Sequence, residues 1–270
     1  MEIRREKLTV DLLDIIVYLC GMRLEIEDLS IGYHRSIVQE HLQLCAGEGE
    51  MICLLGTNGS GKSTLLRTIA GLQPLYGGRI LLCGRDLQRL SSQELARLSA
   101  LVLTERTALV NTHVVDIVGM GRYPYSNLLG GMSASDMEQI EQAIGQCDLA
   151  GLRDRYFNSL SDGEKQRVLL AKAIAQQTPI VLLDEPTAHL DLPGRYRTFA
   201  LLQEMAHEQG KTVVVSTHDL DLALQTADKL WLMKQQGGIV TGTPKELLGS
   251  GVFEEVFGCR ITSLLSVNTH

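Results

Sequence analysis

The chain has 270 residues, a formal net charge of −7 and 44% hydrophobic residues, enough apolar material for one large α/β domain. The negative charge gives no support to a nucleic-acid-binding protein, and aromatic residues, at 4%, are too few for base-stacking platforms. The six cysteines form no CxxC pair and no zinc-like spacing with histidine. We therefore expect reduced, mostly buried cysteines and a cytosolic chain.

Residues 1–21 form an N-terminal extension that we expect to be dispensable. The segment MEIRREKLTVDLLDIIVYLC has a basic start and then an apolar run that contains Asp11 and Asp14. That run falls short of the roughly 20 residues needed to span a bilayer, and no small-residue cleavage site follows it. The extension is interpreted as amphipathic or as not native, with an ordinary domain start at Met22.

Strand and helix patterns alternate after this extension. RLEIEDLSI and IVQEHLQLCA alternate apolar and polar residues, as half-exposed strands do. MICLLG is a continuous apolar run that predicts a buried strand of a parallel sheet, and STLLRTIAGL after it is predicted to be a helix. We then expect a strand at GGRILLCG, a helix capped by Ser91 and Glu94, and a buried strand at ALVLT.

A phosphate-binding loop lies between the MICLLG strand and the helix after it. Residues 56–64, GTNGSGKST, match G-x-x-x-x-G-K-[ST] in the strand–loop–helix context that confirms this pattern. Glycines let backbone N–H groups converge on phosphates, Lys62 brings a positive charge to the outer phosphates, and the Ser63 hydroxyl suits Mg²⁺. The expected nucleotide-binding residues of the loop are Gly56, Thr57, Asn58, Gly59, Ser60, Gly61, Lys62, Ser63 and Thr64. Kinases, GTPases and many motors share such a loop, so the rest of the chain must identify the class.

Residues 107–160 show little strand signal and predict a helical insertion. We expect a helix in ASDMEQIEQAIGQC, capped by Ser135 and Glu138. The apolar residues expected on one face of this helix are Met137, Ile140 and Ile144.

A second anion site is predicted at LSDGEKQR, residues 160–167. Ser161 and Glu164 form a capping box, and Gly163 leaves the backbone N–H groups open to close approach. The N-terminus of a helix favours anions. Because the chain already has a phosphate loop, these residues alone leave open which anion the second site binds.

The run IVLLDEP, residues 180–186, is an apolar strand that ends in two acids, at the edge where parallel sheets bind ligands. Asp184 is suited to hold Mg²⁺, and Glu185 is suited to orient or deprotonate an attacking water. His218 ends another predicted strand at the same edge and could help to position that water. The segment AHLD, residues 188–191, follows the acids and could couple this site to something outside it.

The remaining pattern predicts the strands KLWLMK and IVTG and then a helix in TPKELL. Thr243 is its expected cap, with Pro244 at the first helical position and Glu246 three residues after the cap. We therefore expect a main domain over residues 22–242 and a C-terminal helical tail over residues 243–270.

In their order along the chain, the motifs resemble those of the ATP-binding cassette (ABC) family: the phosphate loop, LSDGE, LLDEP, HLD and STHD. The resemblance covers about residues 23–242. It implies a P-loop NTPase (RecA-like) core with an antiparallel β-portion, an inserted helical subdomain at about residues 107–160, and ATP and Mg²⁺ as ligands. Tyr33, in LSIGY, matches the family's aromatic residue that stacks on adenine, and Glu185 and His218 match its catalytic residues.

The resemblance also implies a second copy of the chain. In the family, two ATP-binding domains pair head to tail, and the signature helix of one caps the γ-phosphate held by the P-loop of the other. Ser161 and Gly163 should then serve the partner's ATP.

Two departures from the family pattern concern charge. The usual signature ends Gly-Gly-Gln, whereas Asp162, Gly163 and Glu164 stand here, and we expect Asp162 to point away from the partner's phosphate. Glu105 occupies the position of a glutamine that touches Mg²⁺ and senses the permease. A carboxylate can also coordinate Mg²⁺, so Glu105 is an expected metal ligand.

Residues 114–125, VVDIVGMGRYPY, lie where family members meet their transmembrane partner, and the ending GRYPY is similar to importers of iron-siderophores, haem and cobalamin. The resemblance implies an ATPase on the cytoplasmic face of the cell membrane that powers uptake through a permease, with a substrate-binding protein and no nucleic acid. The alternatives are a cassette for another solute, such as a metal ion or an amino acid, a non-transport cassette, and a regulatory ATP-binding module without hydrolysis. The transported molecule is not identified by the sequence.

Overall fold

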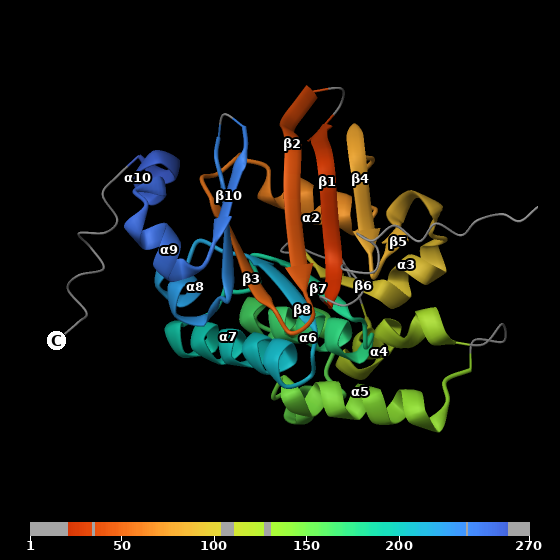
Figure 1. Cartoon of the computed structure of the whole chain (residues 1–270). Helices are drawn as coiled ribbons and strands as arrows, with labels where there is room; N and C mark the ends of the chain where they lie inside the picture. The colour runs from red at the N-terminus through yellow and green to blue at the C-terminus, as the bar shows by residue number, and fades with distance from the viewer. Residues whose placement is uncertain (1–20, 34–35, 104–110, 127–130, 236, 259–270) are drawn as a thin grey trace, which may run out of the picture.

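A computed structural model describes residues 21–33, 36–103, 111–126, 131–235 and 237–258. Two sheets with helices packed on them make up this part of the molecule (Figure 1). The strands are β1 (Met22–Tyr33), β2 (Ser36–Gly47), β3 (Met51–Gly56), β4 (Gly77–Leu82), β5 (Arg85–Asp86), β6 (Ser99–Val102), β7 (Ile180–Asp184), β8 (Thr212–Ser216), β9 (Lys229–Met233) and β10 (Ile239–Gly242). The α-helices are α2 (Lys62–Ile69), α3 (Ser92–Leu98), α4 (Val114–Gly119), α5 (Ala134–Gln146), α6 (Asp162–Ala175), α7 (Leu192–His207), α8 (Leu220–Thr226), α9 (Pro244–Gly249) and α10 (Val252–Phe257). The short 3₁₀ helices are η1 (Leu87–Arg89), η2 (Met120–Tyr125), η3 (Ala150–Leu152) and η4 (Phe157–Ser159).

The larger sheet has the strand order β10-β9-β3-β8-β7-β6. Strands β9, β3, β8, β7 and β6 pair in parallel, and β10 pairs antiparallel with β9. Strand β3 is buried at every position because apolar side chains cover both faces of the sheet. Such coverage explains why the sequence shows a continuous apolar run there. This architecture confirms the predicted α/β P-loop NTPase fold.

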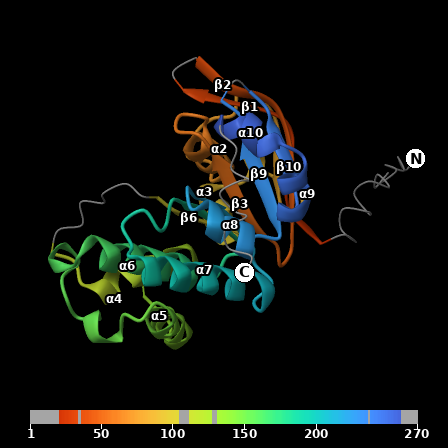
Figure 2. The ribbon, with the colours of Figure 1, turned by 90° about the vertical axis from the view of Figure 1, so that its left-hand side faces the viewer.

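The smaller sheet is the antiparallel β-portion, with the order β2-β1-β4-β5. Its inner face shares one apolar core with helix α2 and with one face of the parallel sheet. Figure 2 shows it at the opposite end of the molecule from α4 and α5.

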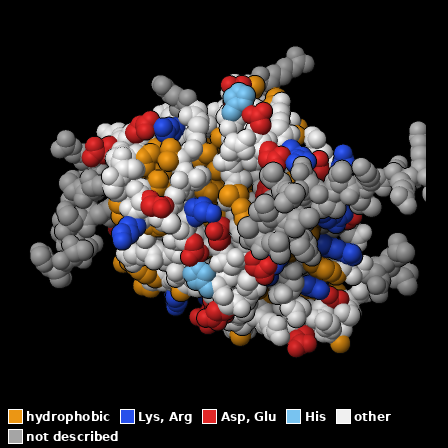
Figure 3. Space-filling view, in the orientation of Figure 1, with side chains coloured by type: hydrophobic (Ala, Val, Ile, Leu, Met, Phe, Trp, Pro, Cys, Tyr) orange, Lys and Arg blue, Asp and Glu red, His pale blue; other side chains and the backbone are white. Residues whose placement is uncertain are grey.

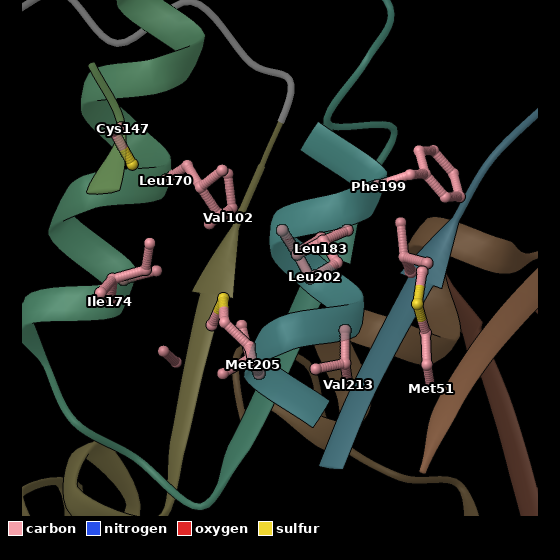
Figure 4. Close-up of a cluster of buried hydrophobic side chains, with 14 of the residues drawn as sticks. Met51, Val102, Cys147, Leu170, Ile174, Leu183, Phe199, Leu202, Met205 and Val213 are labelled. Atoms are coloured by element: carbon pink, nitrogen blue, oxygen red, sulfur yellow. The ribbon is translucent and has the colours of Figure 1, made fainter. Parts of the chain in front are cut away.

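Helices α6 and α7 cover the second face of the parallel sheet. Phe199 and Leu202 of α7 belong to the same buried cluster as Leu183 and Val213 of the central strands (Figure 4). This packing buries the second face of the sheet, while the carboxyl ends of β7 and β8 carry the polar residues Asp184 and Ser216.

Where the structure describes it, the segment between β6 and α6 contains the helices α4, η2, α5, η3 and η4, joined by turns and by one isolated bridge between His113 and Tyr156. The predicted cap of α5 is wrong, because Ser133 and Asp136 form the capping box in place of Ser135 and Glu138. The predicted apolar face is only partly buried. Ile140 and Ile144 are buried in the core, but Met137 is 39% exposed.

The other predicted capping boxes are confirmed. Ser91 pairs with Glu94 at α3, and Thr243 pairs with Glu246 at α9, where Pro244 lies at the first helical position. The two partners of each box lie three residues apart, so the short S/T-x-x-E pattern is enough to predict them.

The surface in the view of Figure 3 carries positive and negative side chains interspersed with apolar ones. The described cysteines are free thiols, as expected, but Cys45 is exposed, whereas Cys53 and Cys147 are buried and Cys83 is half-buried. Among the helices of the described residues, none combines the length and apolar character needed to cross a bilayer.

Candidate functional site

The predicted phosphate loop connects β3 to α2 and has the backbone that its glycines permit. Gly59 and Gly61 have φ of 80° and 109°, in the region that side-chain-bearing residues rarely adopt. At Gly56 an added Cβ would lie 2.6 Å from the Met233 carbonyl oxygen, so the loop packs directly on the end of β9. The glycines therefore allow both the turn and its close seat on the sheet.

Lys62 folds back into the loop from the first position of α2. Its Nζ donates hydrogen bonds to the carbonyl oxygens of Gly56 at 2.9 Å and Thr57 at 3.2 Å. Burial lowers the pKa of the Lys62 ammonium, while the carboxylates of Glu185 and Asp184 act in the opposite direction. These carboxylates are thus close enough to act on the ammonium, which joins the loop to the acids in one site.

The loop also carries donors that match a phosphate group. Helix α2 has no side-chain cap, so its first backbone N–H groups have no partner within the helix. The buried hydroxyl oxygens of Thr57 and Ser60 have no hydrogen-bond partner in the structure. Uncapped helix N-termini beside a lysine bind anions, so these residues fit the phosphates of a nucleotide.

The two predicted acids lie at the carboxyl end of β7. Asp184 pairs with Ser216 of β8, and the Ser216 hydroxyl donates to the Asp184 carboxylate at 2.7 Å. Glu185 has a φ of 49°, and its N–H donates to Ser216, at 3.0 Å to the hydroxyl and 3.1 Å to the carbonyl. Ser216 therefore fixes both acids, although nothing in the sequence analysis singled it out.

His218 contacts the same pair of strands. Its Nε2 lies 2.8 Å from Oε1 of Glu185, and the two side chains are 46% and 32% exposed. The structure thus brings together Lys62, Asp184, Glu185 and His218, which come from three separate parts of the chain.

The second predicted anion site is the N-terminus of α6. The expected capping box is confirmed: the Glu164 carboxylate accepts hydrogen bonds from the Ser161 N–H and hydroxyl, both at 2.7 Å. These bonds, first that from the hydroxyl, lower the pKa of Glu164. Asp162 forms an ion pair with Lys165 at 3.2 Å, on the exposed side of the helix.

A cavity of about 570 Å³ opens at this helix end. Its walls come from residues 146–148, 161–170 and 189–201, and none of the residues that line it lies in the phosphate loop. Gly163 faces Leu190, since an added Cβ would lie 3.2 Å from the Leu190 Cδ2. The signature residues Ser161 and Gly163 therefore share a cavity with the AHLD segment of the same chain.

Asp219 is a further residue that sequence reasoning missed. Its carboxylate accepts hydrogen bonds from Thr187 at 3.2 Å and from Arg195 at 2.9 Å. Arg195 also donates to the carbonyl of Leu190 at 3.0 Å. Asp219 directly follows His218, so these contacts connect the acid site to the segment that lines the cavity, and only that adjacency could have indicated the connection.

Tyr33 and Glu105 are the remaining predicted ligands. Tyr33 ends β1 and is 38% exposed. Glu105 lies outside the described residues. Within the described residues, no group of three or more His, Cys, Asp or Glu side chains is arranged to hold a metal. Asp184 and Ser63 fit Mg²⁺ nonetheless, because this ion usually takes one or two protein ligands together with phosphate oxygens and waters.

Comparison with known proteins agrees with this geometry. Residues 39–188 match the model of a family described as "ABC transporter". A relative from Bacillus subtilis (strain 168), named "Probable siderophore transport system ATP-binding protein YusV", is 36% identical over 238 residues, covering 87% of this chain and 86% of the relative.

Two solved structures also resemble the chain. A metal-chelate type ABC transporter in an inward-facing conformation superposes with a TM-score of 0.77 and 30% identity, over 88% of this chain and 89% of that one. The dimeric cassette MJ0796 in a post-hydrolysis state, bound to ADP and phosphate, gives a TM-score of 0.73 and 25% identity, over 82% of this chain and 98% of that one. With a family match over more than half of its length, the chain belongs to the ABC transporter family.

Proposed function

We propose that the chain is the ATP-hydrolysing subunit of an importer that takes up a metal chelate of the iron-siderophore, haem or cobalamin type. The observation that carries this proposal is the gathering of Lys62, Asp184, Glu185 and His218 around an uncapped helix N-terminus. The named function of the relative from Bacillus subtilis and the metal-chelate transporter with the same fold support the substrate class.

The phosphate loop and the two acids have different proposed roles. The loop binds the phosphates of ATP, whereas the acids act on Mg²⁺ and on the attacking water. The backbone N–H groups of residues 56–64 and the Lys62 ammonium hold the phosphates of ATP, and Tyr33 lies against the adenine. Ser63, Asp184 and Glu105 are the proposed ligands of Mg²⁺, which would neutralise negative charge on the phosphate oxygens. The Ser216 hydroxyl donates to the Asp184 carboxylate and so fixes the orientation of this proposed ligand.

Glu185 is the proposed general base for the attacking water. Its Oε1 lies against His218, so Oε2 remains to accept the proton of a water held beside the terminal phosphate. His218 keeps the carboxylate in place and can donate to the γ-phosphate through its ring once ATP is bound.

We further propose that a second copy completes each ATP site. No residue of the phosphate loop lines the cavity at Ser161 and Gly163. One chain therefore presents the two halves of an ATP site, the phosphate loop and the signature residues, at separate places. The dimeric form of the related cassette supports pairing of two copies. A permease would hold the pair at the cytoplasmic face of the membrane and receive substrate from a substrate-binding protein.

The variant Glu185→Gln tests the proposed chemistry. The amide keeps the size of the side chain but cannot take a proton, so turnover should fall by about 10²–10⁴-fold. ATP binding should survive, and the variant should elute as a dimer with ATP in size-exclusion chromatography. Hydrolysis at the wild-type rate would remove Glu185 from the mechanism. Uptake of ferric siderophore in cells carrying this variant, compared with cells carrying the wild type, tests the substrate class.

A further inference from the structure

Gln39 is a buried amide at the back of the phosphate loop. Its side chain lies in β2 and is 1% exposed. Its Nε2 donates to the carbonyl oxygens of Ser60 at 2.9 Å and Lys234 at 2.8 Å, and its Oε1 accepts from the Gly238 N–H at 2.8 Å. One amide therefore connects the antiparallel sheet, the phosphate loop and the turn between β9 and β10.

The carbonyl of Ser60 belongs to the peptide that leads into Gly61. Every described peptide is trans, so the N–H of a peptide points away from its own carbonyl. The Gln39 amide holds the Ser60 oxygen on the β2 side, and the Gly61 N–H therefore points away from β2. Backbone N–H groups of such loops converge on phosphate, so the direction of this one matters for binding.

The phosphate loop also packs closely against β2. An added Cβ at Gly61 would lie 3.0 Å from Cγ1 of Val38, the residue next to Gln39. Lys234, which directly follows β9, also forms an ion pair with Glu255 of α10 at 2.7 Å. The Gln39 amide is thus bonded to a segment that also contacts α10.

We propose that Gln39 is a positioning residue: it fixes the Ser60–Gly61 peptide so that the Gly61 N–H faces the phosphates of ATP. This proposal rests on the proposed ATP-binding function and makes Gln39 a determinant of phosphate affinity that does not touch the nucleotide. It differs from a purely structural role, in which Gln39 would only connect β2 to the β9–β10 turn.

The test compares Gln39→Met with Gln43→Met. Methionine matches glutamine in length and removes all three hydrogen bonds, whereas Gln43 lies exposed four residues further along the same strand. Isothermal titration of the purified full chain with ATP and Mg²⁺ should show about tenfold weaker binding for Gln39→Met, the effect of losing about one oriented hydrogen bond. The rate at saturating ATP should stay near the wild-type value, because Glu185 and His218 are untouched.

A second measurement separates positioning from general loss of structure. Amide hydrogen exchange without nucleotide should accelerate in peptides covering residues 57–64 of Gln39→Met and remain unchanged in peptides covering α7. Acceleration throughout the chain would indicate a purely structural role and overturn the proposal.

The outcomes distinguish failure of the proposed ATP-binding function from failure of the proposed role of Gln39. If the wild-type chain fails to bind ATP, the proposed function fails. If the wild type binds ATP and Gln39→Met binds it within twofold of that affinity, only the positioning role is overturned. Should Gln39→Met fail to fold, Gln39→Asn decides: its shorter amide cannot reach both carbonyls, and affinity within twofold of the wild type again overturns the role.

Discussion

A single hydroxyl group orders the acid end of the site. The Ser216 hydroxyl donates to Asp184 and accepts from the N–H of Glu185, so it sets the carboxylate of one residue and the backbone of the other. A buried carboxylate held in this way loses less conformational freedom when it binds a metal ion. Hydrogen-bond partners of metal ligands generally have this orienting effect.

Replacing Ser216 by alanine should therefore weaken the use of Mg²⁺. We expect Ser216→Ala to raise the Mg²⁺ concentration for half-maximal ATP hydrolysis by about tenfold, the smaller of the effects typical for outer-shell partners. The measurement is a Mg²⁺ titration of the steady-state rate at saturating ATP. Ser99→Ala, at the other end of the same sheet, is the matched control and should leave the titration unchanged. An unaltered titration for Ser216→Ala would show that the hydroxyl does not act through the metal ligand.

At the scale of an element, helix α5 begins where tertiary contacts select its cap. The sequence offers two overlapping boxes, Ser133 with Asp136 and Ser135 with Glu138, and local pattern alone does not separate them. The Asp136 carboxylate accepts from the Ser133 N–H and hydroxyl and also from buried Arg122 at 2.8 Å. The ion pair with Arg122 is available only to the first box, and it decides where the helix starts.

Asp136 should make the stability of this helix depend on pH. The hydrogen bonds from Ser133, and then that from Arg122, lower the pKa of Asp136 to about 2. A carboxylate with a lowered folded-state pKa contributes stability above its ordinary value of 3.8, and this contribution is lost as the pH falls towards 2. Asp136→Asn should therefore reduce the free energy of unfolding at pH 7, and the difference from the wild type should narrow at pH 3.

Urea unfolding at the two pH values measures this effect. The matched control is Glu138→Gln, which changes the exposed acid of the alternative box and should leave the free energy of unfolding nearly unchanged. A difference between Asp136→Asn and the wild type that stays constant down to pH 3 would contradict the assigned cause.

The sequence predicts local and motif-based features well and long-range contacts poorly. The phosphate loop, the LLDEP strand and the cap of α6 follow from short patterns. Gln39 could not be found, because two residues of β2, Glu40 and His41, oppose the single residue Ser30 of β1 between the pairs Leu42–Leu29 and Gln39–Ile31. This bulge at His41 turns Gln39 inward, whereas strict alternation from Leu42 would bury Glu40 instead. The bond between Glu185 and His218 likewise depends on how two strand ends meet.

At the scale of the whole molecule, the phosphate loop and the cavity at Ser161 lie in different regions of one chain. We expect two inactive variants to complement each other, because a heterodimer of Lys62→Ala and Ser161→Arg would contain one intact composite site. An equal mixture should recover roughly a quarter of the wild-type sites if subunits exchange freely. The ATPase rate of the mixture, compared with the rates of each variant alone, measures this recovery. The rate of each single variant is the control, and a mixture no faster than the sum of the two separate rates would contradict the composite site.

The left-handed backbone at Glu185 has a consequence for how this protein could evolve. A φ of 49° costs a residue with a side chain on the order of 1–2 kcal/mol, which glycine would not lose. A glycine at this position would relieve the backbone and abolish the carboxylate in one step. Selection for stability and selection for ATP hydrolysis therefore act in opposite directions on residue 185. The glutamate would persist only while catalysis is required.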